Sequence, residues 1–142
     1  MRYKLSAPAT LHTTIQLPAS KSISNRALIL HALAQGHIAP SNLSDCDDTR
    51  VMIKALDGNP GHIDILAAGT AMRFLTAYLS VAPGTRIITG TERMQQRPIR
   101  ILVDALRELG AQIEYAGKEG FPPLRITGTA VSYTHLTLPT KR

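Results

Sequence analysis

The sequence predicts an α/β fold built from a β-α-β-α-β-β unit. Short runs of β-forming residues alternate with longer segments of helical periodicity, and glycine or proline separates most of them. The last two runs, AQIEYA and LRITG, follow each other without a helix between them. The 142 residues are enough for one domain with a core and too few for two.

The first half of the chain predicts two strands, two helices and an extended segment. The strands are MRYKL (1–5) and TTIQL (13–17), and HIAPSNL (37–43) is an edge strand because it contains Pro40. A helix runs from Ser22 to Ala34, with Ser20 as its N-cap and Gly36 beyond its end. SDCDDTRVMIKAL begins with acidic residues and becomes helical. The apolar face of the first helix predicts burial of Ile23, Ala27, Leu28, Leu30 and Leu33.

The second half begins at the turn DGNPGH (57–62), which is followed by a short apolar strand and a glycine-threonine corner. A helix then ends at Pro83-Gly84, RIITG (86–90) is a strand, and TERMQQRP (91–98) is a loop. The next helix covers residues 99–109 and ends at Gly110. Strands 111–116 and 124–128 complete the unit. The apolar stripe of the last helix is Ile99, Leu102, Val103, Leu106 and Leu109.

Composition and charge narrow the function classes. No run approaches the roughly 20 apolar residues of a membrane span, and no apolar leader opens the chain. Cys46 is the single cysteine, which favours a reducing cytoplasm. The formal charge is +6, but lysines and arginines are scattered and aromatic residues are few. This pattern favours small anionic ligands over nucleic acid or a membrane.

Polar residues gather at the first strand-to-helix corner, ASKSISNR. A helix N-terminus presents free N–H groups and about half a positive charge, so it binds anions. Lys21 adds an ammonium and Ser22 a hydroxyl at this corner. Arg26 lies one helical turn after Ser22, so both can hold a phosphate or a carboxylate. Taken alone, the same pattern fits a capped helix with solvated charges.

Two further corners share this design. In AAGTAMRF, Gly69 lets a ligand approach the backbone, Thr70 offers a hydroxyl and Arg73 follows one turn later. In MQQRPI, Arg97 precedes Pro98, which is expected at the first position of the helix. Either corner alone is a weak signal. Three cationic corners together predict a site for a small molecule with several negative charges.

Other sites are not indicated. The chain lacks the P-loop and dinucleotide-binding motifs, and its histidines lack metal-ligand spacing. SDCDDT is explained by acidic residues at a helix start rather than by a metal site, and Cys46 has no motif partner that would make it a nucleophile. We therefore assign no metal-binding residues.

Five blocks of the chain resemble the 5-enolpyruvylshikimate-3-phosphate synthase family, in the family's order and up to about Gly128. They are LPASKSISNRALIL, SDCDDTRVMIKAL, AAGTAMRFL, TGTERMQQRPIRILVDALRELGA and FPPLRITG. The sister family of UDP-N-acetylglucosamine enolpyruvyl transferases is not expected to match the corners together. The resemblance implies an enolpyruvyl transferase-like inverse α/β barrel of β-α-β-α-β-β units, incomplete in this chain.

The resemblance also implies an activity. The enolpyruvyl group of phosphoenolpyruvate is transferred to the 5-hydroxyl of shikimate 3-phosphate, with release of phosphate and without a metal or organic cofactor. By resemblance, Lys21 contacts both substrates, and Ser22 and Arg26 hold shikimate 3-phosphate. Gly69 and Arg97 bind phosphoenolpyruvate, with Thr70 and Arg73 in support. Full-length relatives are expected to be cytoplasmic monomers without nucleic-acid or membrane partners.

Two positions near the second corner depart from the family pattern. Ala67 stands where many members have asparagine, and Phe74 where many have proline. We expect both departures to affect affinity for phosphoenolpyruvate.

Length is the larger departure, because family members are about three times longer. Residues 1–18 are expected to belong to the other domain, 19–129 to form part of the first domain, and 130–142 to be a foreign or frame-shifted tail. The family's catalytic proton-transfer residues match no position here, so we predict that the chain alone is inactive. The alternatives are a basic fragment that binds anions or nucleic acid without catalysis, and a fragment that complements the missing domains in trans.

Overall fold

The computed structural model describes residues 3–4, 6–10, 12–58 and 60–129. It contains a four-stranded sheet in the order β1-β2-β4-β3, formed by β1 (His62–Asp64), β2 (Gly84–Thr89), β3 (Gln112–Tyr115) and β4 (Leu124–Gly128). β1 and β2 are parallel, whereas β4 is antiparallel to both β2 and β3. The register aligns Ile63 with Ile88 and Ile88 with Leu124, so apolar side chains form one buried row across the sheet.

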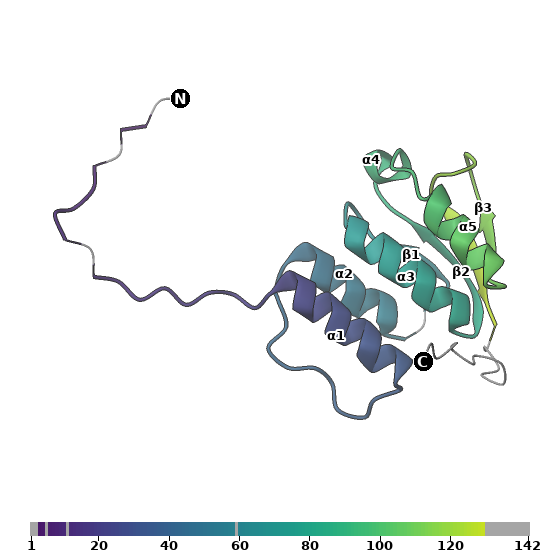
Figure 1. Cartoon of the computed structure of the whole chain (residues 1–142), viewed down its shortest axis with the longest axis horizontal. Helices are drawn as coiled ribbons and strands as arrows, with labels where there is room; N and C mark the ends of the chain where they lie inside the picture. The colour runs from purple at the N-terminus through teal and green to yellow at the C-terminus, as the bar shows by residue number, and fades with distance from the viewer. Residues whose placement is uncertain (1–2, 5, 11, 59, 130–142) are drawn as a thin grey trace, which may run out of the picture.

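Five helices connect and cover these strands: α1 (Lys21–Leu33), α2 (Asp47–Leu56), α3 (Gly69–Val81), α4 (Glu92–Gln95) and α5 (Arg100–Glu108). α3 packs on β2 and β4, and α5 packs on β3 (Figure 1). α1 and α2 pack against α3, which therefore lies between them and the sheet. The large apolar side chains with almost no exposure are Met52, Ile65, Met72, Leu75, Leu79, Ile88, Val103, Leu124 and Ile126.

Local hydrogen bonds explain where α1 begins and where α5 ends. Ser20 caps α1, as predicted, because its hydroxyl accepts a hydrogen bond from the Ile23 N–H at 3.4 Å. Gly110 ends α5 with a φ of 93°, a conformation that favours glycine. The Gly110 N–H bonds the Arg107 carbonyl and the Ala111 N–H bonds the Leu106 carbonyl, each at 2.9 Å, which is a Schellman motif.

A buried arginine donates to two carbonyls that directly follow the end of α3. Arg86 on β2 is 5% exposed, and its guanidinium donates to the Ala82 carbonyl at 3.1 Å and to the Pro83 carbonyl at 2.7 Å. A cation at this position complements the negative end of the helix dipole. The N-terminus of α3 has no comparable side-chain cap, because its N-cap residue is Ala68.

Three predicted segments differ from the structure. Residues 13–17 form no strand; the segment 12–20 is extended and runs away from the helices (Figure 1), with Ile15 74% and Leu17 84% exposed. Residues 37–43 also form no strand, and part of the predicted loop 91–98 is the short helix α4. A strand needs a partner for its backbone hydrogen bonds, and within the described residues neither segment has one. The prediction for 1–5 falls partly on residues outside the described ranges.

The predicted buried face of α1 was wrong. Leu28 is buried, but Ile23 is 71%, Leu30 65% and Leu33 50% exposed. The buried face instead contains Ser24 and Asn25, which hydrogen-bond to residues around the start of α2. α1 is apolar on several sides, so periodicity alone did not show which side meets α2.

Leu109 was predicted to belong to the apolar stripe of the last helix, but it lies just after the end of α5 and is 84% exposed. Among the described residues no helix has the length and apolar character to cross a membrane. The predicted tail, 130–142, lies outside the described residues.

Candidate anion-binding site

A cavity of about 430 Å³ lies beside the N-termini of α1 and α3. It brings together six of the seven predicted site residues, from all three corners. Ser22 is the exception: it is exposed and does not line the cavity, although its carbonyl accepts a hydrogen bond from Arg26 Nη1 at 2.9 Å. The lining residues are Lys21, Arg26, Asp48, Ala67, Gly69, Thr70, Arg73, Phe74 and Arg97.

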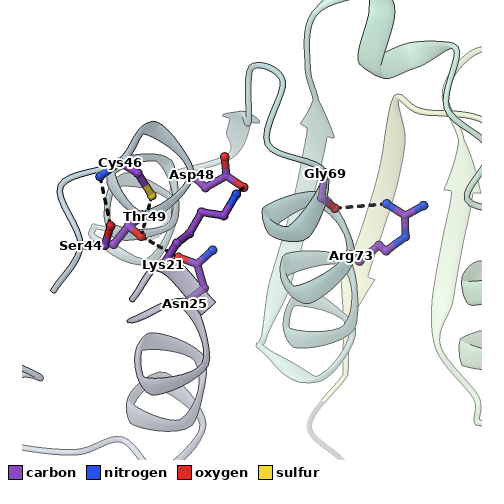
Figure 2. Close-up of polar contacts among 8 residues, drawn as sticks. All are labelled: Lys21, Asn25, Ser44, Cys46, Asp48, Thr49, Gly69 and Arg73. Carbon is purple, nitrogen blue, oxygen red and sulfur yellow. Dashed lines mark hydrogen bonds and ion pairs between the residues drawn. The ribbon is translucent and has the colours of Figure 1, made fainter. Parts of the chain in front are cut away.

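The first corner places two cations on the cavity wall. Lys21 is the first residue of α1, and its ammonium lies 3.4 Å from the Asp48 carboxylate on α2 (Figure 2). Arg26 is farther along α1, and its guanidinium carbon lies 5.5 Å from the centre of the Phe74 ring on α3. Both cations are thus held by neighbouring helices while they remain exposed to solvent.

The second corner is shaped by the turn between β1 and α3. Leu66 has a φ of 52°, and its N–H donates to the Asp64 carboxylate at 2.8 Å, which stabilises this left-handed turn. α3 then begins at Gly69. Arg73 donates to the Gly69 carbonyl at 3.2 Å (Figure 2), so the arginine lies against the first turn of the same helix.

The third corner is joined to the second by a close backbone contact. A Cβ added at Gly90 would lie 2.5 Å from the Leu66 carbonyl oxygen, so glycine is needed for this approach. The Thr91 N–H donates to the same carbonyl at 3.0 Å. α4 follows, and the chain then places the Arg97 guanidinium over Gly69, where a Cβ would lie 2.6 Å from Arg97 Nη1.

Pro98 is not the first residue of α5, contrary to the sequence prediction. The N-cap is Ile99, and its N–H bonds the Gly120 carbonyl at 2.9 Å. Arg97 therefore reaches the cavity from the connection between α4 and α5. Arg97 lines the cavity, but it does not directly precede the helix as predicted.

The cavity is positively charged. The cations Lys21, Arg26, Arg73 and Arg97 outnumber the acid Asp48 among its described lining residues. The N-termini of α1 and α3 add partial positive charge. Such a site can hold phosphate and carboxylate groups together.

Asp48 was predicted only as an acidic residue at a helix start, but it also lines the cavity. It does lie in the first turn of α2, and its side chain is 22% exposed. A single acidic residue can serve both a helix dipole and a lysine on another helix. The sequence held no signal of the second contact.

Hydrogen bonds link the start of α2 and the residues before it to α1. The Ser44 N–H donates to the Ser24 hydroxyl at 2.8 Å, and the Thr49 hydroxyl donates to the Asn25 side-chain carbonyl at 2.9 Å. Cys46 Sγ lies 3.3 Å from the Thr49 hydroxyl (Figure 2). These bonds satisfy several of the polar groups that are buried between the two helices, whereas the buried Asn25 Nδ2 has no hydrogen-bond partner among the described residues.

Cys46 belongs to this network. Burial raises the pKa of its thiol, but hydrogen bonding with Ser44 and Thr49 outweighs burial, so the pKa lies below the usual 9.0. Over the described ranges, no three histidine, cysteine or acidic side chains gather in a way that could hold a metal ion.

The profile of the family described as EPSP synthase (3-phosphoshikimate 1-carboxyvinyltransferase) matches residues 5–58 and 59–140. A protein of Bacteroides fragilis named 3-phosphoshikimate 1-carboxyvinyltransferase is 72% identical over 138 residues, covering 97% of this chain and 34% of the relative. A protein of the same name from Burkholderia vietnamiensis is 46% identical, covering 84% of this chain and 33% of the relative. The chain thus spans about a third of the length of these curated relatives.

The fold is also similar to that of a solved structure, EPSP synthase from Acinetobacter baumannii. The TM-score is 0.66 at 24% identity, over 80% of this chain and 32% of that one. The family match extends to residue 140 and so overlaps the segment that we predicted to be foreign. The origin of that segment stays a prediction. With a profile match over most of its length, this chain belongs to the EPSP synthase (3-phosphoshikimate 1-carboxyvinyltransferase) family.

Proposed function

We propose that this chain forms one wall of the active site of an enzyme that transfers the enolpyruvyl group of phosphoenolpyruvate to shikimate 3-phosphate. The observation that carries the proposal is the convergence of Lys21, Arg26, Arg73 and Arg97 on one cavity. Both substrates carry a phosphate and a carboxylate, and the cavity offers four cations and two helix N-termini to them.

The proposed roles follow the positions of the residues. Lys21, at the start of α1, contacts both substrates, and Arg26 holds shikimate 3-phosphate. Ser22 lies outside the cavity lining and assists through its carbonyl, which accepts a hydrogen bond from Arg26. Gly69 and Arg97 bind phosphoenolpyruvate, because the Arg97 guanidinium lies over the first residue of α3. Thr70 and Arg73 support this corner, and the hydrogen bond from Arg73 to the Gly69 carbonyl orients the arginine.

In the proposed reaction, the 5-hydroxyl of shikimate 3-phosphate loses its proton as its oxygen bonds to C2 of phosphoenolpyruvate, and the C2=C3 double bond opens as C3 gains a proton. The C2–O bond to phosphate then breaks and C3 loses a proton, which restores the double bond. Fixed cations position the two anions and stabilise charge on the departing phosphate. The described lining residues supply this electrostatic part, and we assign the proton transfers to groups outside them.

We therefore expect the 142-residue chain alone to bind the substrates weakly and not to turn them over. Its site is open to water, which weakens ionic contacts. Turnover is proposed for the longer protein, in the cytoplasm, as a monomer without a cofactor or a nucleic-acid partner. The single cysteine supports a reducing compartment.

Substrate titrations of the purified chain, followed by backbone NMR, test this function. We expect Arg26→Ala to weaken shikimate 3-phosphate binding and Arg97→Ala to weaken phosphoenolpyruvate binding, each by about ten-fold or more, because a charged hydrogen bond is lost. Arg50→Ala is the matched control, since Arg50 is an exposed arginine on α2 that does not line the cavity. Equal losses in all three variants would show that net charge binds the ligands and would refute the site. Tight, steeply salt-dependent binding of DNA or RNA would favour the nucleic-acid alternative.

A further inference from the structure

We propose that Phe74 is a positioning residue for Arg26, and that its ring holds the guanidinium in the cavity wall for an anionic ligand. This inference rests on the proposed function, because it assigns Arg26 to ligand binding. Its basis is the cation–π contact of 5.5 Å between the Arg26 guanidinium and the Phe74 ring.

The contact joins two of the three corners. Arg26 belongs to α1, whereas Phe74 belongs to α3, one residue after Arg73. Both residues line the polar cavity and also an apolar groove of about 510 Å³ between these helices. Phe74 therefore borders both apolar side chains of the groove and the Arg26 guanidinium. Other residues that line the groove are Ile29, Leu30, Leu33, Ala77, Tyr78 and Val81.

Arg26 has a second contact, which fixes its direction. Its Nη1 donates to the Ser22 carbonyl at 2.9 Å, one turn earlier on α1. The ring and the carbonyl together restrict an exposed side chain that has many rotatable bonds. Because those rotamers are restricted before a ligand arrives, less conformational entropy is lost on binding.

The contact with Arg26 changes which substrate we expect Phe74 to affect. Many family members are expected to have proline where this chain has Phe74, and we expected the change to act on phosphoenolpyruvate. In the structure the aromatic ring contacts Arg26, which we assign to shikimate 3-phosphate. Proline has no π-system, so the cation–π contact depends on the aromatic residue of this chain.

The ligand-free chain provides the first test. In the wild type, ring-current shifts from Phe74 should move the Arg26 side-chain proton resonances upfield in NMR spectra. Phe74→Leu should abolish these shifts while keeping an apolar side chain of similar size, and Phe74→Tyr should retain them. Random-coil Arg26 shifts in a folded wild-type chain would overturn the proposal.

The second test is a double-mutant cycle on inorganic phosphate binding. An exposed cation–π contact predicts that Phe74→Leu weakens binding by about two- to five-fold. Phe74→Tyr should restore it, and the substitution should have no effect in an Arg26→Ala background. Phe121→Leu is the matched control, because Phe121 is the other phenylalanine and stacks with Lys118 at 4.6 Å outside the cavity lining.

The outcomes separate the two proposals. Equal weakening by Phe74→Leu in the presence and absence of Arg26 would refute the positioning role while leaving the anion site intact. A wild-type chain that binds no phosphate or substrate would refute the proposed function and the effect on affinity. The NMR shifts would still decide whether the ring holds Arg26.

Discussion

Gly69→Ala should impair anion binding while leaving stability nearly unchanged. A Cβ at this position would lie 2.6 Å from Arg97 Nη1 and 3.2 Å from Arg97 Cζ. Ordinary contact begins at 3.4 Å, so the guanidinium has to retreat by most of an ångström. The neighbour is the mobile end of a long side chain, and Gly69 does not have a positive φ, so the fold can accept the methyl group.

The expected loss of affinity follows from the contact between Arg97 and the ligand that the displacement removes. A hydrogen bond to a charged group contributes about 1.5–3 kcal/mol, so displacing Arg97 should weaken phosphoenolpyruvate binding by about ten- to hundred-fold. The free energy of unfolding should change by less than about 1 kcal/mol, because alanine is a better helix former than glycine. Isothermal titration and urea unfolding of the same preparations measure the two quantities.

A control variant and a double variant separate the displacement of Arg97 from any general effect of replacing glycine by alanine. Gly61→Ala is the control, because no atom lies within 4 Å of the added Cβ and the backbone is not left-handed there. In an Arg97→Ala background, Gly69→Ala should have no further effect on affinity. Unchanged phosphoenolpyruvate affinity in the single variant would refute the reasoning, as would a large loss that persists without Arg97.

Three further predictions concern the same region. Gly90→Ala should lower the free energy of unfolding by about 2–4 kcal/mol in urea titrations, because the added methyl group meets the Leu66 carbonyl and strains its hydrogen bond from the Thr91 N–H. An unfolding free energy equal to that of the wild type would contradict the close approach of Gly90 to Leu66. Asp48→Asn should strengthen phosphate binding about two- to five-fold in calorimetry, because Lys21 loses its ion-pair partner; weaker binding would mean that the carboxylate helps to hold the anion. The pH profile of Cys46 alkylation by iodoacetamide should have its midpoint at a lower pH in the folded chain than in the chain unfolded in urea, because hydrogen bonding lowers the pKa of the folded thiol. Identical folded and unfolded profiles would exclude the shift.

The sequence predicted the parts of the site that depend on local chemistry. Glycine and serine marked helix boundaries correctly at Ser20 and Gly110, because caps act within one turn of the helix. The cations of the three corners were found for the same reason. Each lies near a helix start that can be recognised from a few residues, although only the second corner follows a strand in the structure.

The sequence did not predict the features that depend on contacts between distant segments. Ser24 and Asn25 are buried because residues about twenty positions later supply their hydrogen bonds. The contact of Asp48 with Lys21 has the same origin, since it requires α2 to lie beside α1. Residues 13–17 have a β pattern, but a pattern cannot provide the neighbouring strand that backbone pairing requires.

The hydrogen bonds between α1 and α2 also determine how the two helices are aligned along their axes. Apolar side chains can slide past one another at little cost, whereas a hydrogen bond weakens steeply once its length and angle depart from their optimum. The bonds from Ser44 to Ser24 and from Thr49 to Asn25 therefore favour one position of α1 along its axis relative to α2. An apolar replacement of this pair could preserve the packing of the helices and still let α1 shift lengthwise. Such a shift would carry Lys21 away from its place beside the cavity, so the polar pair contributes accuracy of placement in addition to stability.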